Sequence, residues 1–128
     1  MMLISLVDDD PLYQFILKRQ IANSGVPARL LQFHDGMEAL DYFISNQTDT
    51  VNLPDLVLLD INMPYIDGWQ FLDEIAKIDL AKKNIRIYIV SSSDSIADQQ
   101  RAMTYNSLAG YLCKPMTIEK FLKIIDTF

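Results

Sequence analysis

Acidic side chains follow two short apolar runs of this sequence. The run Leu56 to Leu59 stops at Asp60, and the run Leu3 to Val7 stops at the pair Asp8 and Asp9. A carboxylate at the end of a buried segment is unfavourable unless it meets a partner of opposite charge. Carboxylates of this kind can hold a hard cation such as Mg²⁺, and an ionised one can attack a phosphorus atom.

A hydroxyl group and an ammonium group follow two further apolar runs. The segment Ile85 to Val90 leads into Ser91, and the segment Leu108 to Cys113 leads into Lys114. If the four runs are strands of one parallel sheet, their carboxyl ends lie at the same edge, where open α/β sheets bind ligands. The three carboxylates, the hydroxyl and the ammonium can then converge on one site.

The elements that would position these groups alternate regularly along the chain. Short, mainly apolar runs predict strands at 3–7, 28–33, 56–59, 85–90 and 108–113. Helices are predicted to begin near Asp10, Asp35, Asp67, Ser95 and Thr117. This order favours an α/β fold of the doubly wound (βα)5, flavodoxin-like type, with a five-stranded parallel sheet in the order 2-1-3-4-5. The first and third strands are then neighbours, so their acidic residues lie side by side.

Helical spacing indicates which side chains face the core. In the first helix the residues predicted to face inward are Leu12, Phe15, Ile16 and Ile21. The segment 95–105 is poor in large apolar residues and is predicted to be the least firmly packed helix. Trp69 is predicted to be a partly exposed residue near the site. The other residues predicted to face inward include Met37, Leu40, Phe43, Ile44, Ile118, Phe121, Leu122 and Ile125.

Length and composition set further limits. The chain has 128 residues, half of them apolar, which predicts a single domain over residues 1–128. A net charge of −6 argues against non-specific nucleic-acid binding, which needs a basic surface. One cysteine precludes an internal disulfide and fits a reducing compartment. The sequence has neither a signal peptide nor an apolar run long enough for a membrane span, so a cytoplasmic location without a membrane partner is predicted.

These motifs, taken together and in this order, resemble those of response-regulator receiver domains of the CheY-like superfamily, over essentially the whole chain. The matching segments are Val7-Asp8-Asp9, Leu59-Asp60-Ile61-Asn62-Met63-Pro64 with Asp67-Gly68, Ser91-Ser92, and Gly110-Tyr111 through Lys114-Pro115. Two positions depart from the usual pattern. Ser91 stands where the family usually has threonine, and Ser107-Leu108 replaces a small Gly-Ala pair. Neither departure removes a chemical group that the site needs.

The resemblance implies a phosphorylation site and a metal site. Asp60 looks like the phosphoacceptor. Asp8 and Asp9 look like the acidic pair that holds Mg²⁺, with Asp60 and the backbone carbonyl of Asn62 completing the protein ligands. The chemistry agrees, because Mg²⁺ takes oxygen ligands and offsets the repulsion between clustered carboxylates.

The resemblance also implies roles for the groups at the other strand ends. Ser91 looks like the hydroxyl that binds the phosphoryl group. Lys114, joined to Pro115 by a cis peptide bond, looks like the lysine that pairs with it. Ser91 and Tyr111 look like the conformational switch, in which the hydroxyl moves towards the phosphoryl group and the tyrosine swings inward.

The implied function is that of a stand-alone two-component response regulator, and not of an enzyme beyond its own phosphorylation and dephosphorylation. A sensor histidine kinase or a histidine phosphotransfer protein would supply the phosphoryl group. A downstream protein would bind the face formed by the fourth helix, the fifth strand and the last helix. The resemblance leaves open a monomer or a phosphorylation-dependent dimer, and it implies no nucleic-acid partner.

Three alternatives remain open from the residues alone. A phosphatase that works through an aspartyl-phosphate usually has a second aspartate two residues after the nucleophile, where this chain has Asn62. A flavodoxin-like cofactor binder would need a phosphate-binding loop after the first strand, where this chain has the acidic residues 8–10. A docking module that is never phosphorylated is disfavoured by the complete set of site residues.

Overall fold

The computed structural model describes residues 1–80 and 83–128, and within these residues five parallel strands form one sheet in the order β2-β1-β3-β4-β5. The strands are β1 (Met2–Val7), β2 (Ala28–Phe33), β3 (Leu56–Leu59), β4 (Arg86–Ser91) and β5 (Leu108–Cys113). The helices are α1 (Pro11–Asn23), α2 (Gly36–Ser45), α3 (Gly68–Ile75), α4 (Ile96–Ala102) and α5 (Ile118–Ile125). The predicted doubly wound α/β fold and its strand order are confirmed. None of the helices in these described residues is both long and apolar enough to cross a membrane.

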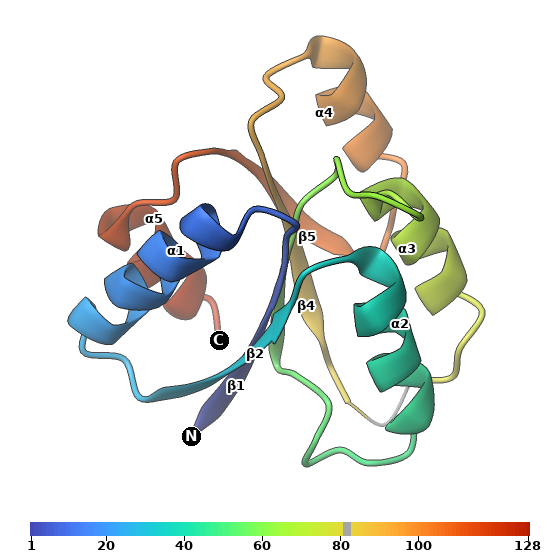
Figure 1. Cartoon of the computed structure of the whole chain (residues 1–128), viewed down its shortest axis with the longest axis horizontal. Helices are drawn as coiled ribbons and strands as arrows, with labels where there is room; N and C mark the ends of the chain where they lie inside the picture. The colour runs from blue at the N-terminus through green and yellow to red at the C-terminus, as the bar shows by residue number, and fades with distance from the viewer. Residues whose placement is uncertain (81–82) are drawn as a thin grey trace.

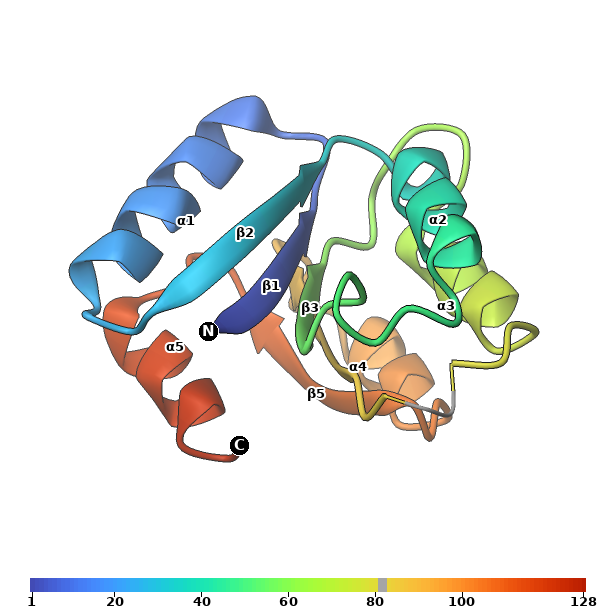
Figure 2. The same cartoon turned by 90° about the horizontal axis from the view of Figure 1, so that it is seen from below.

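Different helices cover the two faces of the sheet. Figures 1 and 2 show α1 and α5 on one face and α2, α3 and α4 on the other. In β3, Val57 and Leu59 belong to the core beside α2 and α3, whereas Leu56 and Leu58 belong to the core beside α1 and α5. All four side chains are buried, because β3 is the central strand and both of its faces are covered. This is why its sequence is a continuous apolar run.

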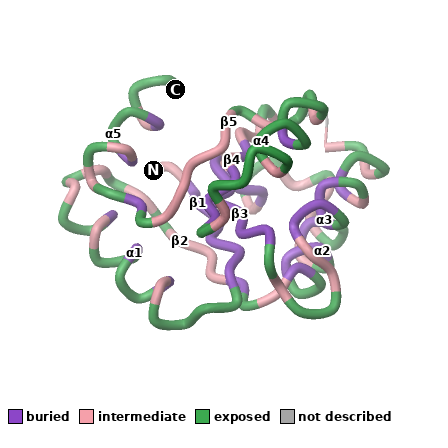
Figure 3. Tube along the Cα trace, turned by 90° about the horizontal axis from the view of Figure 1, so that it is seen from above, coloured by how far each residue is buried: buried purple, intermediate pink, exposed green. Residues whose placement is uncertain are grey.

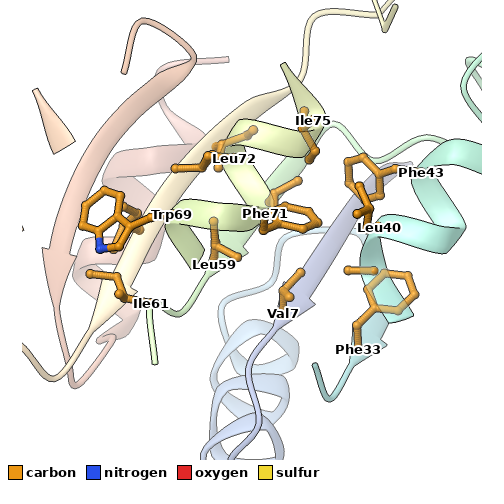
Figure 4. Packing of buried hydrophobic residues seen from close by; sticks show 14 of the residues in the cluster. Val7, Phe33, Leu40, Phe43, Leu59, Ile61, Trp69, Phe71, Leu72 and Ile75 are labelled. Atoms are coloured by element: carbon orange, nitrogen blue, oxygen red, sulfur yellow. The ribbon is translucent and has the colours of Figure 1, made fainter. Parts of the chain in front are cut away.

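The core beside α2 and α3 supports the end of the sheet where the acidic residues lie. Figure 4 shows Phe71 of α3 among Val7, Leu59 and Phe43. The Phe43 and Phe71 rings meet edge to face, with their centroids 5.7 Å apart. Val7 and Leu59 are the residues directly before the acidic positions, so this packing fixes the backbone from which the carboxylates project.

The prediction for the inner face of α1 is confirmed for Ile21, which is buried, and wrong for the other three residues. Leu12, Phe15 and Ile16 are 66%, 55% and 46% exposed. The buried residues of this helix are Gln14, Leu17 and Ile21. The exposed apolar residues and the buried residues both have helical spacing. The prediction followed the side with more large apolar residues, because a hydrophobic pattern does not reveal that a glutamine is buried. Three other residues predicted to face inward are also exposed: Met37, Ile44 and Leu122.

Helix α4 is held loosely, as predicted. Of the residues Ile96–Ala102, all of which the structure describes, Ala102 alone is buried. Figure 3 shows the contrast between β1 and β3, which are mainly buried, and α4, which is mainly exposed. A helix with so little buried apolar surface can shift at low cost.

Trp69 in the first turn of α3 is buried, with 3% of its surface exposed, and the prediction of partial exposure is wrong. Its indole stacks on the Tyr105 ring, with centroids 5.5 Å apart, and the Arg101 guanidinium carbon lies 4.7 Å from an indole ring centroid. The Tyr105 hydroxyl donates to Asp73 of α3 at 3.0 Å. The cover over Trp69 therefore comes from Arg101 in the last turn of α4 and from Tyr105 in the segment after it, which local spacing cannot reveal.

Candidate functional site

The carboxyl ends of β1 and β3 bring the predicted acidic residues together. Val7 and Leu59 are paired across the two strands, and the Asp60 N–H donates to the Val7 carbonyl at 2.9 Å. Asp8, Asp9 and Asp60 each contribute one carboxylate oxygen to a group whose three oxygens lie within 4.8 Å of one another. Asp8 and Asp60 are buried, whereas Asp9 is exposed.

Lys114 reaches these carboxylates from the loop after β5. Its Nζ lies 2.8 Å from Oδ2 of Asp8 and 4.0 Å from Oδ1 of Asp60. The Lys114 N–H donates to the Ser91 carbonyl at 2.8 Å, which joins the loop to the end of β4. The peptide bond between Lys114 and Pro115 is cis, as predicted.

The charges of the site are not balanced by the side chains alone. Burial raises the pKa of Asp60 to about 6, the charge of Asp8 adds to this shift, and the Lys114 ammonium partly opposes it. Burial also raises the pKa of Asp8, against the lowering effect of its hydrogen bond with Lys114. One ammonium group therefore faces three carboxylates, two of them buried. A cluster of oxygen donors with unbalanced negative charge fits a divalent cation such as Mg²⁺.

The backbone around Asp60 is held by the start of α3. A methyl group added to Gly68 would lie 2.6 Å from the Asp60 carbonyl oxygen and 2.9 Å from Cα of Ile61, both far closer than packing allows. The Gly68 N–H donates to the Ile61 carbonyl at 2.7 Å. Glycine is needed here because α3 begins directly against the backbone of Asp60 and Ile61. Asn62 is exposed in this same loop, and the role of its carbonyl as a metal ligand stays a prediction.

Ser91 and Tyr111 meet at a residue that sequence reasoning did not single out. The Ser91 hydroxyl oxygen accepts from the Ser93 N–H at 3.1 Å, and the Tyr111 hydroxyl donates to the Ser93 carbonyl at 2.6 Å. The Ser93 hydroxyl in turn donates to Asp98 of α4 at 2.6 Å. Ser93 thus connects the end of β4, the middle of β5 and the first turn of α4.

Gln14 is a second residue that the sequence did not reveal. Its buried side-chain amide donates to the carbonyl of Asp8 at 2.8 Å and to that of Phe33 at 2.7 Å. Its side-chain oxygen accepts from Gln32 at 3.0 Å. These bonds tie α1 to the ends of β1 and β2 and hold the backbone of Asp8. A buried polar residue of this kind is recognised by its partners, which come from other strands, and not by its neighbours in the sequence.

Residues 4–126 match the family model described as "Response regulator receiver domain". The chain belongs to this family. A receiver domain is a phosphoacceptor signalling domain of two-component systems, and membership implies a kinase partner.

Two proteins similar in sequence are longer than this receiver domain, and the domain matches a different share of each. It is 29% identical, over 97% of its length, to "Probable methanogenesis regulatory protein FilR2" of Methanothrix harundinacea, and it covers 79% of that protein. It is 30% identical, over 93% of its length, to the response regulator MprA of a Mycobacterium species. The chain spans 46% of MprA, less than half of that protein's length.

Solved structures agree with the fold of this receiver domain. A two-component response regulator from Cytophaga hutchinsonii superimposes with a TM-score of 0.89 at 23% identity, covering 99% of this chain and 96% of that one. The response regulator TrrA of Thermotoga maritima, solved in complex with Mg²⁺-BeF, gives a TM-score of 0.76 at 26% identity, covering 99% and 98%. The phosphorylated cyanobacterial phytochrome response regulator RcpA gives a TM-score of 0.76 at 29% identity, covering 98% and 89%.

Proposed function

We propose that this protein is a stand-alone, cytoplasmic receiver that accepts a phosphoryl group on Asp60 in a Mg²⁺-dependent reaction. The donor is a sensor histidine kinase or a histidine phosphotransfer protein. The observation that supports this most strongly is the convergence of three carboxylates within 4.8 Å, with a lysine 4.0 Å from the proposed acceptor. Two of the similar solved structures are also relevant. The response regulator TrrA was solved in complex with Mg²⁺-BeF, and the response regulator RcpA was solved in its phosphorylated form.

The proposed metal ligands are Asp8, Asp9 and Asp60 with the carbonyl of Asn62. When bound, Mg²⁺ offsets the negative charge of the carboxylates and of the phosphoryl oxygens. An Asp60 pKa of about 6 in the metal-free protein leaves most of this carboxylate ionised at neutral pH, which is the form that can attack phosphorus.

In the proposed reaction, an oxygen of the Asp60 carboxylate attacks the phosphorus atom of the donor and forms an acyl-phosphate bond. The bond between phosphorus and the donor's histidine nitrogen breaks, and its electron pair leaves with the donor. Phosphoryl transfer depends on positioning and charge stabilisation more than on covalent assistance. Lys114 supplies a positive charge beside the new phosphoryl oxygens, and the Ser91 hydroxyl donates a hydrogen bond to one of them.

The first prediction concerns phosphorylation itself. The protein is incubated with acetyl phosphate, a small donor, and its intact mass is measured with Mg²⁺ and with a chelator. We expect a gain of one phosphoryl group with Mg²⁺, little gain with the chelator, and complete loss of the gain in Asp60→Asn. A gain that survives in Asp60→Asn, or that does not depend on a divalent ion, contradicts the assignment. Sustained hydrolysis of a small phosphoester would instead support a phosphatase.

We further propose that the signal leaves through α4, β5 and α5. Ser93 supports this route, because it bonds to Ser91, to Tyr111 and to Asp98 of the loosely packed α4. When the Ser91 hydroxyl turns towards a phosphoryl oxygen, its contact with the Ser93 N–H changes, and the bonds from Ser93 to Tyr111 and α4 adjust. Because α4 buries little apolar surface, the shift between the two arrangements needs only a small difference in contacts.

The second prediction tests this route by NMR shift mapping with beryllofluoride, a phosphoryl mimic. We expect the largest changes in the parent protein around Asp60, Ser93 and α4, and at Tyr111. In Ser91→Ala the changes around Asp60 should remain while those in α4 and at Tyr111 disappear. Thr104→Ala, a hydroxyl removal on an exposed residue beyond α4, is the control. Changes confined to residues 60–67 in the parent would mean that the signal leaves by another face.

A further inference from the structure

The Lys114 ammonium lies against an aromatic ring as well as against two carboxylates. Its Nζ is 4.1 Å from the centroid of the Tyr13 ring. The Lys114 side chain is only 18% exposed, so this contact is largely shielded from water. A cation over the face of a tyrosine ring is attracted by the ring's quadrupole, and the attraction is strongest where water is excluded.

The position of the ring is fixed by the start of α1. Asp10 caps this helix, and its carboxylate accepts from the N–H of Tyr13 at 3.1 Å. The next residue, Gln14, is anchored by its bonds to the carbonyls of Asp8 and Phe33. The ring also packs against the core beside α1 and α5. Tyr13 is therefore a fixed surface, tied to the same strand end that carries the acidic pair.

The lysine side chain, in contrast, has a long flexible stem and a compact charge. Its two carboxylate contacts are unequal, at 2.8 Å to Asp8 and 4.0 Å to Asp60. These two contacts alone would allow the ammonium to move away from Asp60, either to a position beside Asp8 only or out into water. The ring face supplies a third contact from a different element, and three contacts define one position.

We propose that Tyr13 is a positioning residue for Lys114, whose ring holds the ammonium between Asp8 and Asp60 where the phosphoryl oxygens will lie. This inference rests on the proposed phosphorylation of Asp60. The ring face carries the effect, so phenylalanine at this position should preserve it and an aliphatic side chain of similar size should not. Tyr13 does not touch the transferred group and acts only through Lys114.

The first part of the test needs no phosphorylation. A proton above an aromatic ring is shielded, so the ε-methylene signal of Lys114 should be shifted upfield in the metal-free protein. Its signal is assigned by its loss in Lys114→Met. We expect the shielding to persist in Tyr13→Phe and to vanish in Tyr13→Leu. A signal without shielding in the parent protein would overturn the proposal.

The second part measures the rate of phosphorylation by acetyl phosphate with saturating Mg²⁺. Tyr13→Leu should be slower by about tenfold, and Tyr13→Phe should retain the parent rate. Leu17→Val, which trims the same buried face of α1 further along the helix, is the control for a merely structural effect. Equal rates in the parent and Tyr13→Leu would overturn the proposal, as would equal slowing in all three variants. If the parent itself gains no phosphoryl group, the proposed function fails, and the shielding experiment still decides the role of Tyr13.

Discussion

Asp60→Asn is expected to make the metal-free protein more stable at pH 7, by about 3 kcal/mol as an order of magnitude. Burial and the neighbouring charges of Asp8 and Asp9 raise the pKa of Asp60 from 3.8 to about 6, although Lys114 opposes the shift. Because the folded pKa is the higher one, the folded state holds this proton more tightly than the unfolded state does. Ionising Asp60 therefore costs stability, and asparagine, which has no charge, removes the cost.

The stability cost of ionising Asp60 depends on pH. Below pH 3.8 the carboxyl is protonated in both states and the cost is absent, whereas above about pH 6 it is present in full. Urea unfolding with a chelator should show that the advantage of Asp60→Asn grows between these values and then levels off. Asp41→Asn, which removes an exposed carboxylate from α2, is the control. A mutant less stable than the parent, or an advantage that is the same at all pH values, would refute the electrostatic account. Added Mg²⁺ should stabilise the parent by mass action, so the difference in stability between Asp60→Asn and the parent should become smaller.

Lys114→Met should have the opposite effect and destabilise the metal-free protein at pH 7 by about 2–3 kcal/mol. The substitution removes the partner of two buried carboxylates, and an unpaired buried charge is strongly destabilising. The loss should be smaller than for most broken buried ion pairs, because the carboxyls can take up protons instead. Since the Lys114 charge lowers the pKa of Asp60, the substitution should raise that pKa above its value of about 6. The loss of stability should accordingly fade as the pH falls and the carboxyls become protonated.

Lys120→Met is the matched control for this substitution. Lys120 donates to the carbonyls of Cys113 and Pro115, close to the same loop, and pairs with neutral groups. Its replacement should cost about 1 kcal/mol, independently of pH in the acidic range. In the double variant Lys114→Met with Asp60→Asn, much of the loss should be recovered, because one of the two unpaired charges is gone. A double variant as unstable as Lys114→Met alone would show that the lysine acts mainly through packing.

The sequence was sufficient to predict the sheet and the residues at its carboxyl edge. Asp8, Asp60, Ser91 and Lys114 each follow an apolar run, and the parallel topology alone brings such positions together. The polar residue that directly follows each strand lies at the carboxyl edge of the sheet, so the order of residues in the sequence indicates which side chains can form the site. Little more than strand order is needed to place these groups.

The residues that support the site were not predictable in the same way. Gln14, Tyr13 and Ser93 act on groups from other elements, and their spacing along the chain does not show this. The error in α1 has the same origin, because the helix has two stripes with helical spacing and buries the one that contains Gln14. Which stripe is buried depends on the backbone carbonyls at the ends of β1 and β2, to which Gln14 donates hydrogen bonds. These tertiary contacts cannot be read from the hydrophobic pattern of the helix.

The contact between α3 and α4 has a practical consequence for following this protein in solution. Trp69 is the single tryptophan of the chain, and its indole is covered by Arg101 in the last turn of α4 and by Tyr105 just after that helix. The residue before it, Gly68, is packed on the backbone of Asp60. Fluorescence excited selectively in this indole therefore comes from one point, between the acidic site and the helix with the least buried surface. The emission of Trp69 should therefore respond to changes at the acidic site and to changes in α4, without any label being attached.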